Sequence, residues 1–71
     1  MENNTFAYRL QKARKKANMT QTEVAKELNV AQTIISRYEN GKLEPNIQTL
    51  TQLIELYDIN ADWLLGTGMK K

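Results

Sequence analysis

The 71-residue chain is predicted to fold as an all-α domain, a compact bundle of five short helices. Apolar side chains recur at spacings of three and four residues, and no stretch shows the apolar and polar alternation of a strand. Residues that cap or end helices separate these periodic stretches. A chain of this length has no room for a second core, so residues 1–71 are expected to form one domain, ordered over about residues 5–66.

The first two helices are marked by an apolar stripe and by a capping pair. The stripe predicts a helix over residues 5–17, and it consists of Phe6, Leu10, Ala13 and Ala17. Thr20 and Glu23 have the spacing of a capping box, in which each side chain binds the other residue's backbone amide, so a second helix begins there. Asn29 tolerates a left-handed backbone and is expected to end this helix after about two turns.

The third helix is expected to begin after Ala31. Ile35 and Tyr38 lie three residues apart and therefore share the face that turns toward the core. Gly41 supplies a permissive backbone at the end of this helix. Pro45 prevents the helix from continuing, so a loop is expected to follow.

The fourth and fifth helices are each expected to begin at an asparagine cap. Asn46 caps the fourth helix, whose wide apolar face suits the centre of a bundle. This face consists of Ile47, Leu50, Leu53, Ile54 and Tyr57. Asn60 caps a short fifth helix that runs through Leu65, and Gly66-Thr67-Gly68 has the composition of a terminating loop.

Composition argues against an enzyme. The chain has no cysteine and no histidine, so it lacks a thiolate nucleophile, an imidazole base and the usual nitrogen or sulfur metal ligands. It also has neither a signal peptide nor an apolar run long enough to cross a membrane. We therefore expect a soluble cytoplasmic protein with no cofactor and no small-molecule substrate. No metal or acid/base role is expected for Glu55, Asp58 and Asp62, since Asp58 and Asp62 resemble helix-terminal residues.

The net charge of +2 conceals an uneven distribution. Residues 1–42 carry eight basic and four acidic side chains, whereas residues 43–69 carry four acidic and no basic ones. Lys70 and Lys71 bring the net charge of the whole chain to +2. Such a split suggests one surface suited to an anion and another turned away from it. Charge alone is equally compatible with two ordinary solvated helix faces.

The second and third helices have the spacing of a helix-turn-helix. Residues 29–31 between them are too few for antiparallel packing and suit two helices that cross steeply. The outward face of the third helix is polar and carries Gln32, Thr33, Ser36, Arg37 and Asn40. Such a face suits base edges, because Arg37 can bind guanine with two hydrogen bonds and Gln32 can bind adenine in the same way. Thr33 can touch a thymine methyl group.

The chain closely resembles the phage-repressor and Cro-like helix-turn-helix family of DNA-binding proteins, often called the Xre family. The resemblance covers nearly the whole chain, and the combination of its motifs is highly specific. It runs through Arg9-Leu10, Arg14, Met19-Thr20-Gln21, Glu23-Val24-Ala25, Leu28-Asn29-Val30, Ile35 to Gly41, Pro45, Leu50 and Asp62 to Gly66. It implies a five-helix bundle, a third helix that enters the major groove, and a homodimer that binds two operator half-sites.

The resemblance also implies roles for particular residues. The residues that contact bases would be Gln32, Thr33, Ser36 and Arg37. Those that contact phosphates would be Gln21, Asn40 and Lys42. Arg14 and Glu39 would form a partly buried ion pair that braces the first helix against the third. The segment Trp63, Leu64 and Leu65 would lie near the dimer contact, although it could also be only the cover of a small core.

Two positions depart from the family pattern, and two others are apolar where exposure is expected. Asn29 stands where glycine is more frequent, but asparagine can adopt the same backbone. Ala31 stands where the family often has a serine or threonine cap, and its loss weakens the start of the third helix by about 0.5 to 2 kcal/mol. Ile34 and Leu43 are expected at the surface, as interface residues, DNA contacts or ordinary surface residues.

These observations together predict a sequence-specific regulator of transcription that binds a double-stranded DNA operator as a dimer. A repressor of the phage or mobile-element type is the first expectation. The alternative is a protein-interaction module of the same fold, such as an antitoxin or adaptor. Salt distinguishes them, because binding to duplex DNA weakens steeply with ionic strength while an apolar protein interface hardly responds.

Overall fold

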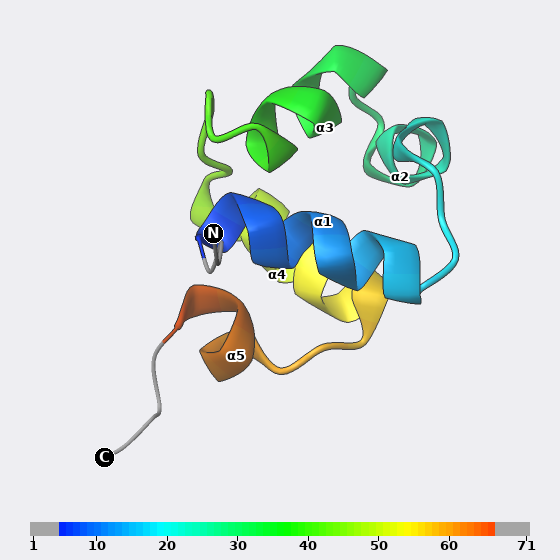
Figure 1. The fold of residues 1–71 in the computed structure, drawn as a ribbon. Coiled ribbons are helices and arrows are strands. Elements are labelled where there is room, and N and C mark those ends of the chain that lie inside the picture. Colours follow the sequence, from blue (N-terminus) through cyan, green and yellow to red (C-terminus); the bar gives the residue numbers. More distant parts are fainter. Residues whose placement is uncertain (1–4, 67–71) are drawn as a thin grey trace.

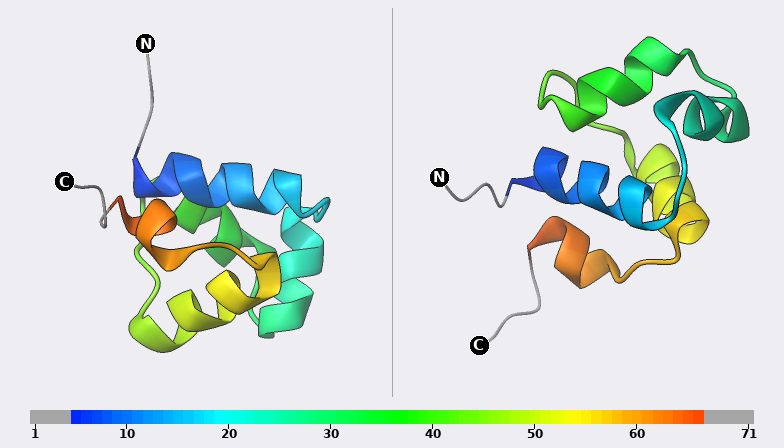
Figure 2. Two further views of the ribbon diagram at one scale, coloured as in Figure 1. Left: turned by 90° about the horizontal axis from the view of Figure 1, so that it is seen from below. Right: turned by 45° about the vertical axis from the view of Figure 1, so that its right-hand side comes forward.

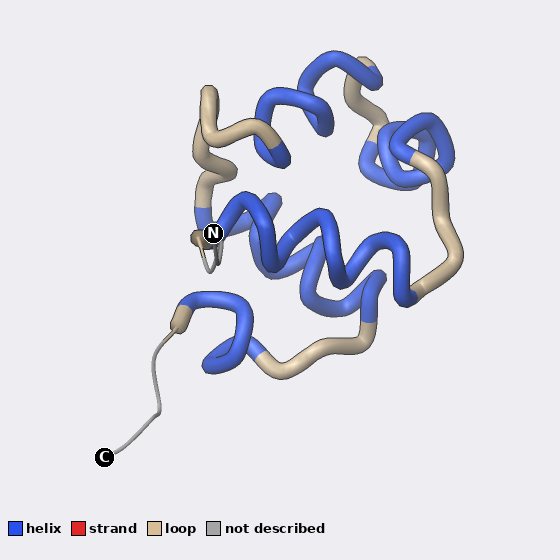
Figure 3. Tube along the Cα trace, in the orientation of Figure 1, coloured by secondary structure: helices blue, strands red, loops and turns tan. Residues whose placement is uncertain are grey.

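A computed structural model describes residues 5–66 and shows five helices in that part of the chain (Figure 1). They are α1 (Phe6–Lys16), α2 (Gln21–Leu28), α3 (Gln32–Glu39), α4 (Ile47–Tyr57) and α5 (Ala61–Leu65). Between residues 5 and 66 there is no strand (Figure 3). The predicted all-helical bundle is therefore confirmed. Thr67 and Gly68 of the expected terminating loop lie outside the described residues.

Side-chain caps begin four of the five helices. In each case a side-chain oxygen accepts a hydrogen bond from the backbone amide three residues later, and the caps are Thr5, Thr20, Asn46 and Asn60. Thr20 and Glu23 form the complete capping box that their spacing predicts. The exception is α3, where Ala31 at the N-cap makes no side-chain hydrogen bond.

The turn between α2 and α3 depends on a left-handed residue. Asn29 has φ of 59° and ψ of 45°, the conformation predicted for it at the end of α2. The backbone amide of Val30 then donates to the carbonyl oxygen of Ala25 at 2.9 Å, which closes the C-terminal end of α2. Asparagine therefore serves at this turn in place of glycine.

The core draws side chains from every helix. The buried apolar residues are Leu10, Ala13, Val24, Ala25, Ile35, Tyr38, Leu53, Tyr57 and Leu64. Figure 2 shows α1 running between α3 and α5, and it contacts both of them. α1 therefore lies centrally in the bundle, and α4 adds the buried side chains of Leu53 and Tyr57 to the core.

The expected apolar face of α4 is buried only in part. Leu53 and Tyr57 are buried and Leu50 and Ile54 are half-buried, but Ile47 is 78% exposed. The prediction that Ile47 belongs to the core-facing stripe is therefore wrong. Ile47 is the first residue of α4, and helical side chains lean toward the N-terminus, so its side chain extends past the end of the helix.

Candidate nucleic-acid interface

Packing of α2 against α3 decides which face of α3 meets solvent. Val24 and Ala25 on α2 and Ile35 and Tyr38 on α3 are all buried. Because successive residues of a helix are about 100° apart, burial of Ile35 and Tyr38 turns the opposite side of α3 outward. The structure thus brings the predicted base-contacting residues onto one surface.

This outward face is polar along its length. Gln32, Thr33, Arg37 and Asn40 are exposed, and Ser36 is half-buried. Asn40 Nδ2 donates to Ser36 Oγ at 3.2 Å, which leaves the hydroxyl hydrogen of Ser36 for another acceptor. Residues 5–66 offer Arg37 no ion-pair partner. The outward face therefore presents donors and acceptors that can bind a ligand.

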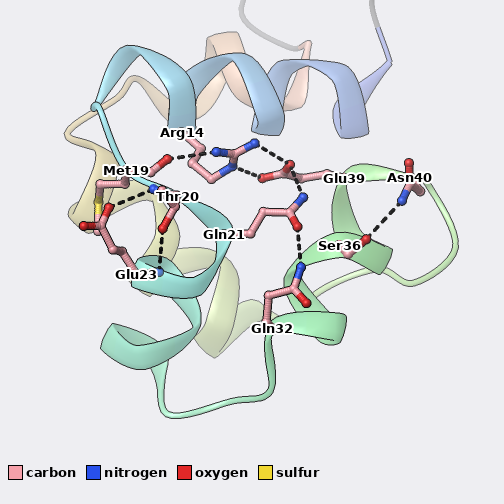
Figure 4. Close-up of polar contacts among 9 residues, drawn as sticks. All are labelled: Arg14, Met19, Thr20, Gln21, Glu23, Gln32, Ser36, Glu39 and Asn40. Carbon is pink, nitrogen blue, oxygen red and sulfur yellow. Dashed lines mark hydrogen bonds and ion pairs between the residues drawn. The ribbon is translucent and has the colours of Figure 1, made fainter.

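A chain of polar contacts connects the core to this face (Figure 4). Arg14 on α1 binds Glu39 on α3 through two hydrogen bonds, with Nε 2.7 Å from Oε2 and Nη2 3.1 Å from Oε1. Arg14 Nη1 also donates to the carbonyl oxygen of Met19 at 2.8 Å. Gln21 Nε2 donates to Glu39 Oε1 at 3.0 Å, and Gln32 Nε2 donates to Gln21 Oε1 at 2.5 Å. The contacts thus run from a buried pair to the exposed start of α3.

The ion pair at the inner end of this chain is nearly withdrawn from water. Arg14 is 9% exposed and Glu39 is 8% exposed. The hydrogen bond to Glu39 raises the pKa of Arg14 above its ordinary value, and desolvation opposes that rise less strongly. Arg14 is therefore positively charged at neutral pH, and the pair braces α1 against α3 as the family resemblance implies.

Gln21 occupies a different position from that of a simple phosphate contact. Its side-chain amide lies between Glu39 and Gln32 and binds both of them. One N–H of the amide remains for an acceptor outside the protein. These two contacts could not be predicted from local spacing, because the partners lie 18 and 11 residues away along the chain.

The other predicted phosphate contacts lie at the opposite end of α3. Asn40 is the C-cap of α3, and Lys42 is exposed in the loop that follows. Gln32 is the first residue of α3, and Gln21, the first residue of α2, contacts it there (Figure 4). The eight residues of α3 extend about 12 Å, and an α-helix with its side chains is about 10 to 12 Å across, which is close to the width of the major groove of B-DNA. Candidate phosphate contacts therefore lie at both ends of a groove-sized helix.

The outward face of α3 itself carries no acidic side chain. Within α3 the one acid, Glu39, is buried and paired. Residues 43–66 carry Glu44, Glu55, Asp58 and Asp62 and no basic residue. The α5 region, where Asp62 lies, is on the far side of α1 from α3 (Figure 1). The charge split along the sequence is not kept as two sides of the fold, because Lys12 and Lys16 line the same hollow as Asp58, and Glu44 lies beside Asn40 at the end of α3.

The segment proposed for dimer contact divides into core and surface. Leu64 is fully buried, whereas Trp63 is 42% exposed and Leu65 is 46% exposed. Trp63 and Leu65 alone are therefore available to a partner. Leu43 is 39% exposed as expected, but Ile34 is half-buried against the core, which corrects the expectation that it lies at the surface.

The part of the chain that the structure describes has neither a cluster of metal-binding side chains nor a membrane-spanning helix. Among residues 5–66 no three acidic side chains gather in a way that could hold a metal ion, the neighbourhood of Glu55, Asp58 and Asp62 included. None of the five helices in this range has both the length and the apolarity needed to span a membrane.

Comparison with known proteins relates the chain to regulators of transcription. Residues 10–64 match a family model described as helix-turn-helix. The chain is 43% identical over 58 residues to the HTH-type transcriptional regulator ImmR of Bacillus subtilis, a match that covers 82% of this chain and 46% of ImmR. It is 37% identical over 61 residues to the HTH-type transcriptional activator BcrR of Enterococcus faecalis, covering 86% of this chain and 30% of BcrR.

A third relative is a phage protein. The cryptic phage CTXphi transcriptional repressor RstR of Vibrio cholerae is 33% identical over 58 residues, which cover 82% of this chain and 52% of RstR. The chain thus spans about half of the length of ImmR and RstR and less of BcrR.

Proposed function

The chain belongs to the helix-turn-helix family with the lambda-repressor-like fold, and on this premise we propose that it is a sequence-specific, double-stranded DNA-binding regulator of transcription. The observation that carries the proposal is the outward face of α3, where four of five polar residues are exposed and no acid is present. An aligned set of uncharged and basic hydrogen-bonding groups on a groove-sized helix matches what base edges require.

In the proposed complex α3 lies in the major groove. Arg37 binds guanine, Gln32 binds adenine, and Thr33 and Ser36 contact neighbouring bases. Gln21, Asn40 and Lys42 contact phosphates near the two ends of α3. The phosphate contacts supply affinity that depends on salt, and the base contacts supply sequence preference.

We also propose that the regulator binds as a symmetric homodimer. Trp63 and Leu65 on α5 offer apolar surface that a second copy would cover. Two operator half-sites would then lie about one helical turn apart. The relatives include a phage repressor, RstR, which supports a repressor of phage or mobile-element type that acts at DNA in the cytoplasm.

Selection of random duplex DNA on the purified protein, at near-physiological salt, tests this proposal. Sequencing of the bound pool should recover an inverted repeat. Absence of any enriched sequence would contradict the proposal and favour the rival function, a protein-interaction module of the antitoxin or adaptor kind. The rival also predicts partner binding that changes little with salt.

Two single substitutions test the assigned contacts. Arg37→Ala should weaken specific binding by about 1 to 3 kcal/mol and relax preference at one base pair. Lys42→Ala, the matched control, should weaken binding to all sequences alike, because a phosphate contact carries no sequence information. An unchanged preferred sequence in Arg37→Ala would contradict the placement of α3 in the groove.

A further inference from the structure

A hollow of about 570 Å³ lies where the start of α1 meets the loop between α3 and α4 (Figure 1). A Cβ placed at Gly41 in this loop would lie 4.0 Å from the Cβ of Ala7 on α1, so the two segments are close neighbours. The volume is within the usual range for small-molecule sites. We propose that this hollow binds a small organic cation, an amine with an apolar body, and that the bound cation strengthens the binding of the protein to DNA. The second half of the proposal rests on the proposed DNA-binding function.

Aromatic side chains form much of the wall of the hollow. Phe6, Tyr8 and Tyr38 border it, and Leu43, which is 39% exposed, adds apolar surface. The faces of aromatic rings attract cations and also cover apolar groups. The ring of Tyr8 already does so within the protein, because Lys12 Nζ lies 5.8 Å from its centre. The wall therefore suits a ligand that is both apolar and positively charged.

The charged side chains that line the hollow are both acidic. They are Glu39 and Glu44, and no lysine or arginine of residues 5–66 borders the hollow. Arg14 neutralises Glu39, whereas Glu44 is exposed and forms no ion pair within residues 5–66. The start of α1 and the end of α3 also border the hollow, and their opposite partial charges of about half a unit each offset one another. The net charge that faces a ligand is therefore negative and comes from Glu44.

Tyr38 brings an unused hydroxyl group to the same hollow. Only 6% of the residue is exposed, and its hydroxyl has no hydrogen-bond partner among residues 5–66. Unlike the hydroxyl of Tyr57, that of Tyr38 is not fully buried, so it reaches solvent, and the hollow is the space that Tyr38 borders. A tyrosine hydroxyl can accept a hydrogen bond from an ammonium group. The hollow thus offers a cation an acceptor as well as a carboxylate.

The position of Glu44 connects this hollow with DNA binding. Asn40, a proposed phosphate contact, borders the same hollow, and Lys42 lies two residues before Glu44 in the loop. A carboxylate close to phosphates repels them, so Glu44 by itself should weaken DNA binding. A cation bound beside Glu44 cancels this repulsion. The bound cation therefore favours the DNA complex, and DNA in turn favours binding of the cation.

Benzylamine is a suitable probe, because it is a cation at neutral pH and has an aromatic body. Benzyl alcohol is its neutral control, with nearly the same shape. In a titration followed by nuclear magnetic resonance, benzylamine should shift the backbone amides of Ala7 and Gly41, which border the hollow from two sides. Benzylamine should bind about tenfold more tightly than benzyl alcohol. Equal binding of the two probes would overturn the proposal.

Two exposed glutamates provide a matched pair of variants. Glu44→Gln keeps the shape of the side chain and removes its charge, whereas Glu55→Gln makes the same change on α4, outside the hollow. Glu44→Gln should weaken benzylamine binding about fivefold and leave benzyl alcohol binding unchanged. Glu55→Gln should bind both probes as the native protein does. Equal affinity of the two variants for benzylamine would show that Glu44 does not hold the cation, and the proposal would fail.

DNA binding tests the connection between the hollow and α3. Glu44→Gln should bind every DNA sequence about threefold more tightly than the native protein does, because a repulsive charge is gone. Benzylamine should tighten the native complex by a similar factor and leave that of Glu44→Gln unchanged, with ammonium chloride at the same concentration as the salt control. No change in the native complex would overturn the role of the cation in DNA binding. If selection enriches no DNA sequence, the proposed function fails, whereas the titration still decides whether the hollow holds a cation.

Discussion

The region of α2 and α3 and the region of α4 and α5 meet solvent in different ways. On α3 the exposed side chains are polar, and Gln32 is tied through Gln21 to a buried ion pair. On α4 and α5 large apolar side chains are exposed, namely Ile47, Trp63 and Leu65. Hydrogen bonds are directional and need fixed partners, whereas apolar burial is not directional. The exposed surface of α2 and α3 is therefore suited to recognising a specific arrangement of hydrogen-bonding groups. The exposed surface of α4 and α5 is suited to contact with another apolar surface.

The largest loss of stability is expected from removing one partner of the buried Arg14–Glu39 ion pair. Arg14→Met leaves the carboxylate of Glu39 buried without its cation, which should lower the free energy of unfolding by about 3 to 5 kcal/mol. Urea unfolding measures this loss. The double variant Arg14→Met with Glu39→Leu should recover most of it, because no unpaired charge remains. A single variant as stable as the native protein would show that the pair does not hold α1 and α3 together.

Two neighbouring leucines sharpen the contrast within the apolar region. Leu64 is fully buried and Leu65 is 46% exposed. Leu64→Ala should cost about 2 to 5 kcal/mol of stability, and Leu65→Ala less than about 0.5 kcal/mol. Thermal unfolding of the two variants at low concentration checks the difference. Sedimentation should show weaker self-association for Leu65→Ala, and equal stability losses would contradict the assignment of Leu65 to the surface.

Tyr57 of α4 carries a polar group into the core. Its hydroxyl is buried and has no hydrogen-bond partner among residues 5–66, and burial raises the pKa of Tyr57 well above its ordinary value of 10.0. Tyr57→Phe removes that unpaired group and should stabilise the fold by about 1 to 2 kcal/mol.

The same residue gives a pH dependence with a definite sign. Above about pH 10 the unfolded chain loses the Tyr57 proton while the folded chain keeps it, so the native protein loses stability as the pH rises. Tyr57→Phe should lose less stability over this range. Denaturant midpoints for both proteins between neutral pH and pH 11 measure the difference, and parallel pH curves would contradict the burial of the hydroxyl.

The smallest effect is expected at the start of α3, the helix with no side-chain cap. Ala31→Thr should stabilise the protein by about 0.5 to 1 kcal/mol, because its hydroxyl can accept a backbone hydrogen bond in the first turn. Ala31→Val has the same shape without the hydroxyl and should bring no such gain. Equal stability of the two variants would indicate that the first turn of α3 is already satisfied.

Local chemistry explains how much of the fold was predictable from the sequence. The capping box at Thr20 and Glu23 and the left-handed turn at Asn29 depend on residues within one helical turn of each other. Spacing alone therefore located them. The polar outward face of α3 was equally accessible, because burial of Ile35 and Tyr38 follows from helical periodicity.

The features that escaped prediction depend on how the helices cross. Gln21 meets Glu39 only because α2 packs against α3, and the exposure of Ile47 depends on where the first turn of α4 ends relative to its neighbours. The periodicity of apolar residues predicted that Ile47 lies in the core, because periodicity depends on a residue's angle around the helix axis. It carries no information on where the residue lies along the bundle. For the same reason, the sequence could not show that Leu64 is buried while Trp63 and Leu65 are exposed.

The short connections between the helices also affect how quickly a newly synthesised chain folds. α2 follows α1 after four residues, and α3 follows α2 after three. All-helical domains dominated by such local contacts fold in microseconds to milliseconds. Ribosomes add about 5 to 20 residues per second, so these 71 residues take about 4 to 14 seconds to synthesise. Synthesis of these residues therefore takes far longer than their folding, so folding adds almost no delay.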